Sequence, residues 1–250
     1  MSKIMDRSPI SIAENKDCMD MMREKPDGFW DLVIADPPYG ISYQSSRRTD
    51  KKSRKPKIQN DESPFIEWIE PLFEKMNDGG RLVCFYRWDV QDMFLNEIKR
   101  SGFTVKSQIV WDKVVHGMGD LLGEFAPQHE LMIYATKGRF EFTGKRPKTI
   151  YRHQRVDPEK LIHPNEKPVD LLKNIILDLS QDGNKLFDPF LGSGSSRIAA
   201  WDMGLDYWGC DLDKDYFCGE EKRFAAHTSK PLLFQPDEMY NFEQTKLFTE

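Results

Sequence analysis

The sequence predicts an α/β protein built on a doubly wound, mostly parallel sheet, and three observations support this. Short apolar runs such as residues 32–35 and 186–187 have the length of buried parallel strands. Amphipathic stretches with helical spacing separate most of these runs, as expected for βαβ units. Two of the runs end in turns rich in proline or glycine, where ligands of open α/β sheets bind.

Length and composition limit the classes of protein to consider. The 250 residues predict one domain over residues 1–229, followed by a polar tail over residues 230–250. The net charge of −5 excludes a generally basic coat, so any nucleic-acid contact must use local basic segments. The four cysteines and five histidines show no metal-ligand spacing, which predicts reduced thiols, no metal and a cytoplasmic protein.

The first elements lead to the most informative turn of the chain. Residues 10–13 predict a short strand, and Asp17 is placed to cap a following helix. A buried strand over residues 32–35 then ends in Asp36-Pro37-Pro38-Tyr39. Because proline lacks a backbone N–H and has a fixed φ, the strand stops there and the turn is stiff.

This turn suits a planar ring that carries an exocyclic amino group. The carboxylate of Asp36 and the carbonyl of Pro37 are two hydrogen-bond acceptors that could hold both amino hydrogens. Tyr39 could stack on the ring. The alternative is a strand-ending turn with a capping aspartate and a core tyrosine, so a second signal is needed.

A basic segment over residues 41–62 follows directly. If the turn holds the base of a nucleic acid, the strand would lie along this segment, so we expect contacts to phosphates rather than only a solvated loop. Its basic residues are Arg47, Arg48, Lys51, Lys52, Arg54, Lys55 and Lys57.

Alternating helices and strands continue through the middle of the chain. A helix over residues 65–76 is expected to begin at Ser63-Pro64 and to end at residues 77–80. A strand over residues 82–85 and a helix from Asp89 to Gly102 come next. Strands over residues 105–111 and 131–135 follow each other without a helix, so one of them should run antiparallel.

A second basic stretch, over residues 138–162, contains aromatic interruptions. The family resemblance given below implies that this stretch reads DNA; its shortness then predicts a short or degenerate target, because few side chains could reach base edges. Its basic residues are Arg139, Lys145, Arg146, Lys148, Arg152 and Arg155. Residues 163–168 then precede an apolar helix; they could be a simple capping turn, or could bring Lys167 to an anionic ligand group.

The second signal lies at residues 186–196, where a strand runs into a glycine turn. It is neither a Walker loop nor a complete dinucleotide fingerprint, because Arg197 stands where the third glycine would be. The next strand ends at Asp211, the usual position of a carboxylate that binds ribose hydroxyls. A glycine loop and a ribose acid without the diphosphate pattern fit S-adenosylmethionine.

Together these segments resemble the beta-class DNA amino-methyltransferases, a circularly permuted family in which the Asp-Pro-Pro-Tyr motif precedes the glycine loop. The resemblance runs over residues 10–226 and implies a seven-stranded Rossmann-like methyltransferase sheet. It assigns a catalytic role to Asp36, Pro37, Pro38 and Tyr39. It assigns cofactor binding to Asp17, Cys18, Asp36, His163, Asn165, Lys167, Pro168, Asp188, Pro189, Phe190, Gly192, Ser193, Gly194, Ser195, Ser196, Asp211 and Leu212.

The resemblance implies methyl transfer to the N6 atom of a flipped-out adenine in double-stranded DNA, in a bacterial or phage-infected cell. Cytosine N4 is the alternative, although family members that act on it more often have Ser at the position of Asp36. A non-catalytic DNA-binding or clamp-binding protein is a third alternative. The sequence leaves open whether the protein forms a homodimer. The tail contains a segment that resembles the short peptide with which bacterial replication proteins bind the sliding clamp, Gln244-Thr245-Lys246-Leu247-Phe248. We favour the alternative that the tail packs on the domain through Leu247 and Phe248.

Overall fold

The computed structural model describes residues 8–40, 63–117, 122–123, 125–157, 166–181 and 183–229. The strands of this part form one sheet in the order β1-β8-β7-β2-β3-β5-β4-β6. Only β5 runs antiparallel to its described neighbours, β3 and β4. The strands are β1 (Ser11–Asn15), β2 (Trp30–Ala35), β3 (Met76–Tyr86), β4 (Thr104–Asp112), β5 (His129–Thr136), β6 (Ile150–Arg152), β7 (Lys185–Asp188) and β8 (Asp206–Asp211).

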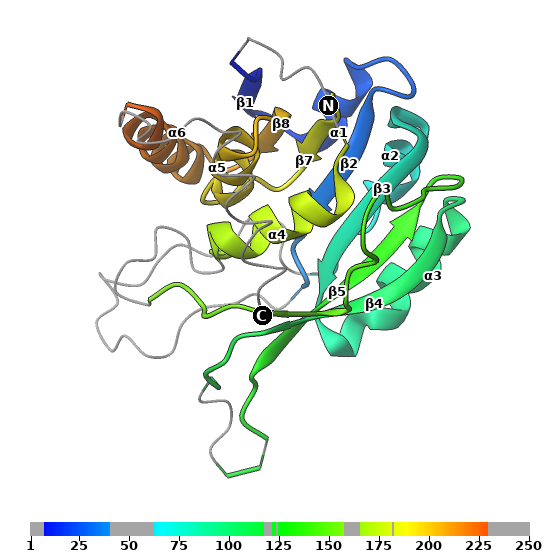
Figure 1. Ribbon diagram of the computed structural model, residues 1–250, viewed down its shortest axis with the longest axis vertical. Coiled ribbons are helices and arrows are strands. Elements are labelled where there is room, and N and C mark those ends of the chain that lie inside the picture. The colour runs from blue at the N-terminus through cyan, green and yellow to red at the C-terminus, as the bar shows by residue number, and fades with distance from the viewer. Residues whose placement is uncertain are drawn as a thin grey trace.

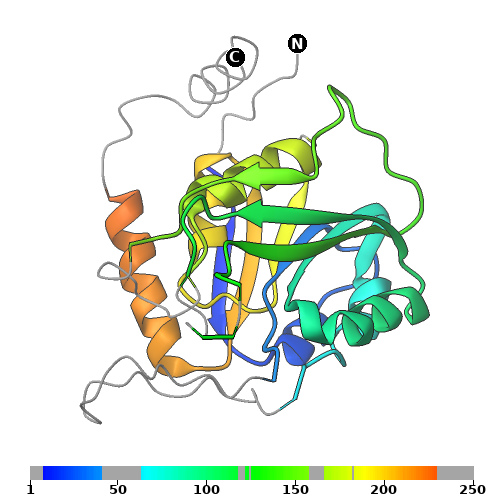
Figure 2. The same ribbon diagram turned by 90° about the horizontal axis from the view of Figure 1, so that it is seen from below.

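Helices cover both faces of this sheet (Figures 1 and 2). One core cluster joins α1 (Cys18–Arg23), α2 (Ile69–Lys75) and α3 (Gln91–Arg100) to one face. A second cluster joins α4 (Val169–Leu179) and α5 (Ser195–Asp202) to the other face, together with Phe217 of α6 (Lys214–Thr228). The predicted doubly wound α/β fold is therefore confirmed. The sheet has one strand more than the seven expected, because the short β6 joins its edge.

The strand directions decide which residues meet. Parallel strands β2, β7, β8 and β1 are neighbours, so their carboxyl ends lie at one edge of the sheet. Because β5 is antiparallel, its first residues lie at that same edge. The prediction that one of the two consecutive strands runs antiparallel is confirmed, and the consequence for the site is described below.

The start of α2 differs from the prediction. The helix begins at Ile69, and Ser63-Pro64 does not cap it. Instead the amide of Phe65 donates to the carbonyl of Pro38 at 3.1 Å, and Pro64 forms a bridge with Tyr39. A Cβ atom on Gly40 would lie 2.6 Å from the backbone of Ser63, so this close approach requires glycine. The segment is held extended against the Asp36 turn.

Two further element boundaries were wrong. Residues 77–80 belong to β3 rather than to the end of a helix, and the amide of Gly79 donates to the carbonyl of Lys137 at 2.7 Å. Asp89 does not begin α3; it lies in a 3₁₀ turn at Trp88–Val90, and its carboxylate accepts hydrogen bonds from Arg87. Sheet pairing and a local ion pair outweigh the turn and capping signals at these places.

Several predictions concern residues outside the described ranges. These are the basic segment 41–62, residues 158–162 of the second basic stretch, the sites His163 and Asn165, and the tail 230–250 with the peptide Gln244–Phe248. Among the described residues, no helix combines the length and apolar character needed to cross a bilayer. In the same residues, no group of three or more His, Cys, Asp or Glu side chains is arranged to hold a metal ion.

Candidate active site

A pocket at the carboxyl edge of the sheet brings the two predicted signals together. Tyr39 of the Pro-rich turn and Gly192 of the glycine turn both line it. The ends of β1, β2, β7 and β8 supply most of its wall, because these strands are parallel neighbours. Its lining residues are Lys16, Asp17, Cys18, Ile34, Asp36, Pro37, Pro38, Tyr39, Phe65, Phe85, Lys167, Leu172, Asp188, Pro189, Phe190, Leu191, Gly192, Ser193, Ser195, Ser196, Asp211, Leu212, Asp213 and Tyr216.

The Asp36 turn is held by side chains on both oxygens of its carboxylate. The Tyr39 hydroxyl donates to Oδ1, and the Lys167 ammonium donates to Oδ2 at 2.5 Å. Burial raises the pKa of Asp36 above its ordinary value, although the Lys167 charge opposes this. The carbonyl of Pro38 is occupied by the Phe65 amide, whereas no donor from the described residues reaches the Pro37 carbonyl. Pro37 is therefore the available backbone acceptor beside Asp36.

Lys167 lines the pocket and contacts two carboxylates of the protein. Its side chain is only 9% exposed, and its ammonium also lies 3.2 Å from a carboxylate oxygen of Glu130. Glu130 in turn contacts the ammonium of Lys113 at 2.7 Å. The structure thus links Lys167 to Asp36 and Glu130, while the sequence had suggested the carboxylate of a ligand. Glu130 was missed, because only the direction of β5 brings it to this edge.

Asp188 stabilises the glycine turn from within. One of its oxygens accepts from the amide of Phe190 at 2.9 Å, and the other accepts from the hydroxyl of Ser196. Burial raises the pKa of Asp188 to about 7. Both oxygens are therefore engaged inside the strand–turn–helix unit, so Asp188 shapes the turn as well as lining the pocket.

The two glycines of the turn have left-handed backbone. Gly192 has φ 53° and Gly194 has φ 74°, a region that other residues adopt at a cost. Gly194 does not line the pocket; a Cβ atom there would lie 2.3 Å from Cγ of Glu220 on α6. Arg223, which the sequence did not single out, donates from α6 to the carbonyl of Ser193 at 2.8 Å. Helix α6 therefore packs closely against the turn and braces it.

Asp211 closes the opposite wall. Its carboxylate accepts from the amide of Gly192 at 2.7 Å and from the amide of Asp213 at 2.8 Å. Burial raises the pKa of Asp211 to about 6. Each carboxylate oxygen can accept more than one hydrogen bond, so Asp211 can also bind hydroxyl groups in the pocket.

At the end of β1, Asp17 caps α1 by accepting from the amide of Met19 at 2.7 Å. Cys18 follows it and is buried, and burial raises the pKa of its thiol to about 12. Both residues line the pocket, as the sequence placed them. The described residue Pro168 does not line it, and forms the N-cap of α4 without a side-chain hydrogen bond.

Comparisons with known proteins identify the family. A family model described as DNA methylase, covering N6 and N4 methyltransferases, matches residues 30–219. The chain belongs to this DNA N6/N4 methyltransferase family.

Individual relatives agree with this assignment. YubD of Escherichia coli (strain K12) is 28% identical over 214 residues, which cover 84% of this chain and 88% of YubD. The DNA adenine methyltransferase YhdJ of the same organism is 27% identical over 240 residues, covering 80% of this chain and 78% of YhdJ.

Solved structures share the fold. The M1.HpyAVI–SAM complex has a TM-score of 0.64 at 22% identity and covers 84% of this chain and 98% of its own. The PvuII DNA methyltransferase, described as cytosine-N4-specific, has a TM-score of 0.68 at 12% identity and covers 94% of this chain and 95% of its own. The chain is an S-adenosylmethionine-dependent DNA methyltransferase of the N6/N4 family.

The chemistry of the pocket fits this cofactor. Its lining carries the carboxylates of Asp17, Asp36, Asp188, Asp211 and Asp213, while Lys16 and Lys167 are the cations among the described lining residues. An acidic wall favours a sulfonium cation and ribose hydroxyls, and it disfavours a phosphorylated cofactor. Both lysines are already paired with carboxylates, Lys16 with Glu14 and Glu24.

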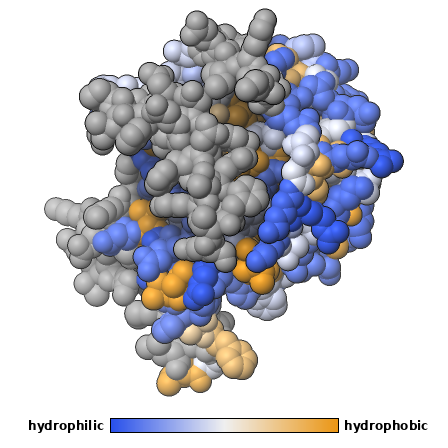
Figure 3. All heavy atoms as spheres, in the orientation of Figure 1, coloured by the Kyte–Doolittle hydropathy of each residue, from blue (hydrophilic) through white to orange (hydrophobic). Residues whose placement is uncertain are grey.

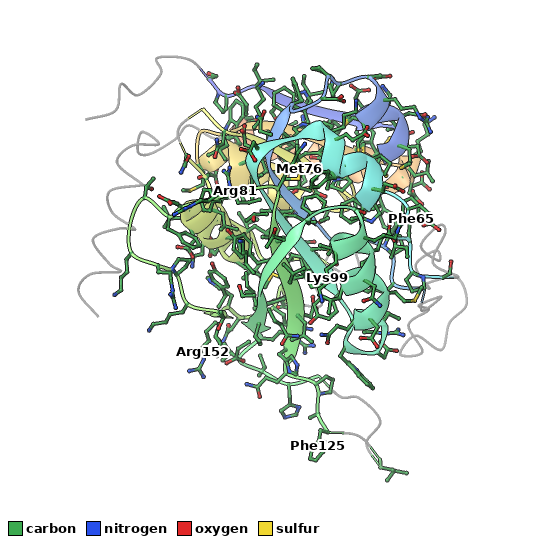
Figure 4. The ribbon with its side chains drawn as sticks, turned by 90° about the vertical axis from the view of Figure 1, so that its right-hand side faces the viewer. Phe65, Met76, Arg81, Lys99, Phe125 and Arg152 are labelled. Carbon is green, nitrogen blue, oxygen red and sulfur yellow. The ribbon has the colours of Figure 1, made fainter. Side chains whose placement is uncertain are left out.

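The predicted DNA-binding residues of the second basic stretch lie at two opposite ends of the sheet. Arg152 lies at the pocket edge, at the end of β6, 3.5 Å from the carboxylate of Asp112. Arg155 follows it and is exposed. Arg139 lies at the other end, where its carbonyl approaches Gly79, and its guanidinium pairs with Glu141 at 2.5 Å. Figure 4 shows Arg152 and Arg81 toward opposite ends of the sheet, with Arg81 stacked on Phe140.

The segment around β6 is anchored on α4. The Tyr151 hydroxyl donates to Asp178 at 2.5 Å, and the ring of His153 contacts the amide of Asn174 at 3.0 Å. The remaining predicted basic side chains of this stretch are exposed: Lys145, Arg146 and Lys148. The described part of the β4–β5 connection extends beyond the edge of the sheet where β4 ends, and Figure 4 labels the exposed Phe125 there. Hydrophobic atoms are also visible at this end of the molecule in Figure 3.

Sequence reasoning missed eight lining residues. Lys16, Leu191 and Asp213 stand next to predicted site residues, so their position beside a motif was the available signal. The others reach the pocket only through the packing of the folded chain. The missed residues are Lys16, Ile34, Phe65, Phe85, Leu172, Leu191, Asp213 and Tyr216.

Proposed function

We propose that this methyltransferase modifies the N6 atom of adenine in double-stranded DNA. The observation that carries the proposal is the placement of the Asp36 carboxylate, the Pro37 carbonyl and the Tyr39 ring in the same pocket as the glycine turn. Two acceptors beside an aromatic ring match an amino group on a planar base. The structure of this turn alone does not separate adenine from cytosine, but an Asp rather than a Ser at position 36 favours adenine.

The target atom is inaccessible inside a duplex, so the base must be flipped out at a cost of about a few kcal/mol. Stacking on the Tyr39 ring would return roughly 1–3 kcal/mol. Asp36 and the Pro37 carbonyl would orient the amino group so that its lone pair faces the methyl donor. Because the methylated nitrogen loses its proton readily, Asp36 acts mainly by alignment, with reacting atoms about 3–3.5 Å apart.

S-adenosylmethionine supplies a methyl group made electrophilic by the positive charge on its sulfur. We assign its ribose hydroxyls to Asp211 and its adenine to the wall formed by Asp17 and Cys18. The turn over residues 192–196 would hold the cofactor against the Asp36 side of the pocket. Lys167, whose ammonium contacts Asp36 and Glu130, is assigned to the Asp36 turn instead of to the methionine carboxylate.

Incubation with labelled S-adenosylmethionine and unmethylated DNA, followed by nucleoside analysis, tests this proposal. The expected product is N6-methyladenine, absent from a reaction with Asp36→Ala. N4-methylcytosine would instead support the second candidate, which the likeness to the PvuII enzyme keeps in view. No transfer to DNA by the folded wild type would favour a non-catalytic DNA-binding or clamp-binding protein.

Mapping the methylated positions in the same DNA tests target length. The described part of the candidate reading segment is short, and two of its side chains, Tyr151 and His153, contact α4. A short segment can bring only a few side chains to base edges, so the expected target is short or degenerate. A unique site of six or more bases would contradict this expectation.

A further inference from the structure

Glu130 lies beside the active site although it does not line the pocket. It is the second residue of β5 and pairs with Trp111 near the end of β4. Because β5 runs antiparallel, this position falls at the edge where the parallel strands end. Its side chain is 30% exposed and contacts two ammonium groups, that of Lys113 at 2.7 Å and that of Lys167 at 3.2 Å.

Lys167 connects this carboxylate to the Asp36 turn. Its ammonium lies between Oδ2 of Asp36, at 2.5 Å, and Glu130. It also lies over the ring of Phe85, 4.8 Å from the centroid, with most of its side chain shielded from water. The order of groups is therefore Asp36, Lys167, Glu130 and Lys113, with alternating charge. In this row the Lys167 ammonium is shared between Asp36 and Glu130, while Lys113 contacts Glu130 alone. Charge interactions of this kind are stronger in a shielded site than in water.

The sharing decides how strongly Lys167 binds Asp36. Without the Glu130 charge, nothing would draw the Lys167 ammonium away from Asp36, and its hydrogen bonds could go to the Asp36 carboxylate alone. A carboxylate that is strongly bound to an ammonium is a weaker acceptor for another donor. We infer that Glu130 is a positioning residue that draws Lys167 partly away from Asp36 and so keeps Asp36 available to the target amino group. This inference rests on the proposed function of the same site.

The electrostatics agree with this geometry. Burial would raise the pKa of Glu130, but the Lys167 and Lys113 charges hold it below its ordinary value. Burial would likewise lower the pKa of Lys167, but Asp36 and Glu130 raise it. Glu130 is thus a negative charge, and it acts to raise the pKa of Asp36.

Other groups also face Asp36 and must be considered in any titration. They come from its own turn, from β3, from β5, from β7 and from the segment before α4. These groups are Tyr39, Cys84, Glu130, Asp188 and Lys167. Asp211 on β8 interacts with Asp188 rather than with Asp36. Variants that each change one charge and leave the other groups in place separate the effect of Glu130 from theirs.

The test is a direct titration of Asp36 by carboxyl carbon NMR in protein labelled at aspartate, with Asp36→Asn used to assign the signal. Glu130→Gln should move the Asp36 midpoint to lower pH by about half a unit to one unit, because a nearby negative charge is removed. Lys113→Gln should move it slightly to higher pH, because the released Glu130 then attracts Lys167 more strongly. The opposite signs distinguish this coupling from a loss of packing.

Methylation kinetics on DNA supply the second readout. In Glu130→Gln, kcat should fall about threefold to tenfold, the acid limb of its pH profile should move to lower pH, and KM should change little. A reduced kcat with an unmoved acid limb and an unmoved Asp36 midpoint would show a merely structural role and overturn the inference. So would shifts of the same sign in both variants. If Glu130→Gln does not fold, the sign of the Lys113→Gln shift decides.

Failure of the proposed function is recognised separately. It would appear as a wild-type enzyme that transfers no methyl group to adenine, whatever the variants do. The NMR titration needs no turnover, so it tests the coupling of Glu130 to Asp36 in either case.

Discussion

The two walls of the pocket are stabilised in different ways. On the glycine side, Asp188 accepts from the amide of Phe190 in its own turn, and Asp211 accepts from the amides of Gly192 in that turn and of Asp213 after its own strand. On the Pro-rich side, Asp36 accepts from the nearby Tyr39 hydroxyl and from Lys167, which is far away in the sequence. The first wall therefore relies on backbone amides, whereas the second relies on side chains, one of them distant in the sequence.

This difference has a functional consequence. The glycine side, whose carboxylates are held by backbone amides, can bind the cofactor whether or not the target base is present. On the Pro-rich side, the hydrogen bonds that Asp36 accepts from side chains can change when a base arrives. We therefore expect substitutions on the two sides to separate cofactor affinity from methyl transfer.

The largest separation is expected for Asp36→Ala. Removing the acceptor that orients the amino group should lower the methyl-transfer rate by at least about 10²–10³-fold. Cofactor affinity should stay within about threefold, because the glycine side keeps its own hydrogen bonds. Single-turnover methylation and calorimetric titration measure the two quantities. Asp89→Ala, which removes a carboxylate on the 3₁₀ turn outside the pocket, is the matched control and should change neither. Full transfer activity in Asp36→Ala would refute the catalytic assignment.

Gly194→Ala should damage the glycine side instead. The substitution combines a left-handed backbone with a Cβ atom 2.3 Å from Glu220, so we expect a loss of about 1–3 kcal/mol in the free energy of unfolding. Cofactor affinity should fall as well. Urea unfolding and calorimetry measure both.

Gly204→Ala is the control for this substitution. Gly204 has a similar φ of 70°, but no atom lies within 4 Å of the position that a Cβ atom would take, so only the backbone strain applies. A smaller loss of stability and unchanged cofactor affinity are expected. Equal losses in both variants would show that the packing of Glu220 against the turn is unimportant.

The two walls also differ in how well the sequence predicted them. The apolar run before Asp36 and the glycines after Asp188 are local patterns, and they fix where each strand stops. The parallel arrangement of strands then brings both ends to one edge, so the shared pocket followed from the fold class. These predictions needed no knowledge of side-chain partners.

The partners themselves depended on the assembled sheet. Glu130 reaches the site only because β5 is antiparallel, and the sequence indicated that one of two strands would be reversed without saying which. The pairing of Lys167 with Asp36 was missed because it joins the turn after β2 to the segment before α4, which are far apart in the sequence. The prediction of a helix cap at Ser63-Pro64 was wrong, because the bridge to Tyr39 is a contact between segments that no local pattern shows.

Stability should depend on pH through Asp188. Burial raises the pKa of this carboxyl in the folded protein to about 7, well above its ordinary value. Between the ordinary and the raised pKa the folded state binds more protons than the unfolded state, so stability falls as pH rises through this range. Relative to Asp188→Asn, the wild type should lose about 2–4 kcal/mol of unfolding free energy between pH 4 and pH 8.

Urea unfolding of both proteins across this range gives the measurement. The comparison with Asp188→Asn is needed because burial also raises the pKa of Glu220 to about 7, and this group titrates in both proteins. The free energy of unfolding of the wild type minus that of Asp188→Asn should fall as pH rises. If this quantity stayed constant or increased, it would contradict the assignment of a buried, largely protonated Asp188 at low pH.

The smallest effect is expected at the basic residues, where the two ends of the sheet can be compared. Arg155 is exposed beyond β6, on the edge that carries the pocket, whereas Arg139 lies near Gly79 at the opposite end and pairs with Glu141. If DNA lies across the pocket edge, Arg155→Gln should reduce the slope of log affinity against log salt by about one, and Arg139→Gln should leave it unchanged. Fluorescence anisotropy with a short duplex over a series of salt concentrations measures both slopes. Equal reductions would mean that DNA follows the whole length of this segment, and a reduction for Arg139→Gln alone would place the DNA at the other end of the sheet.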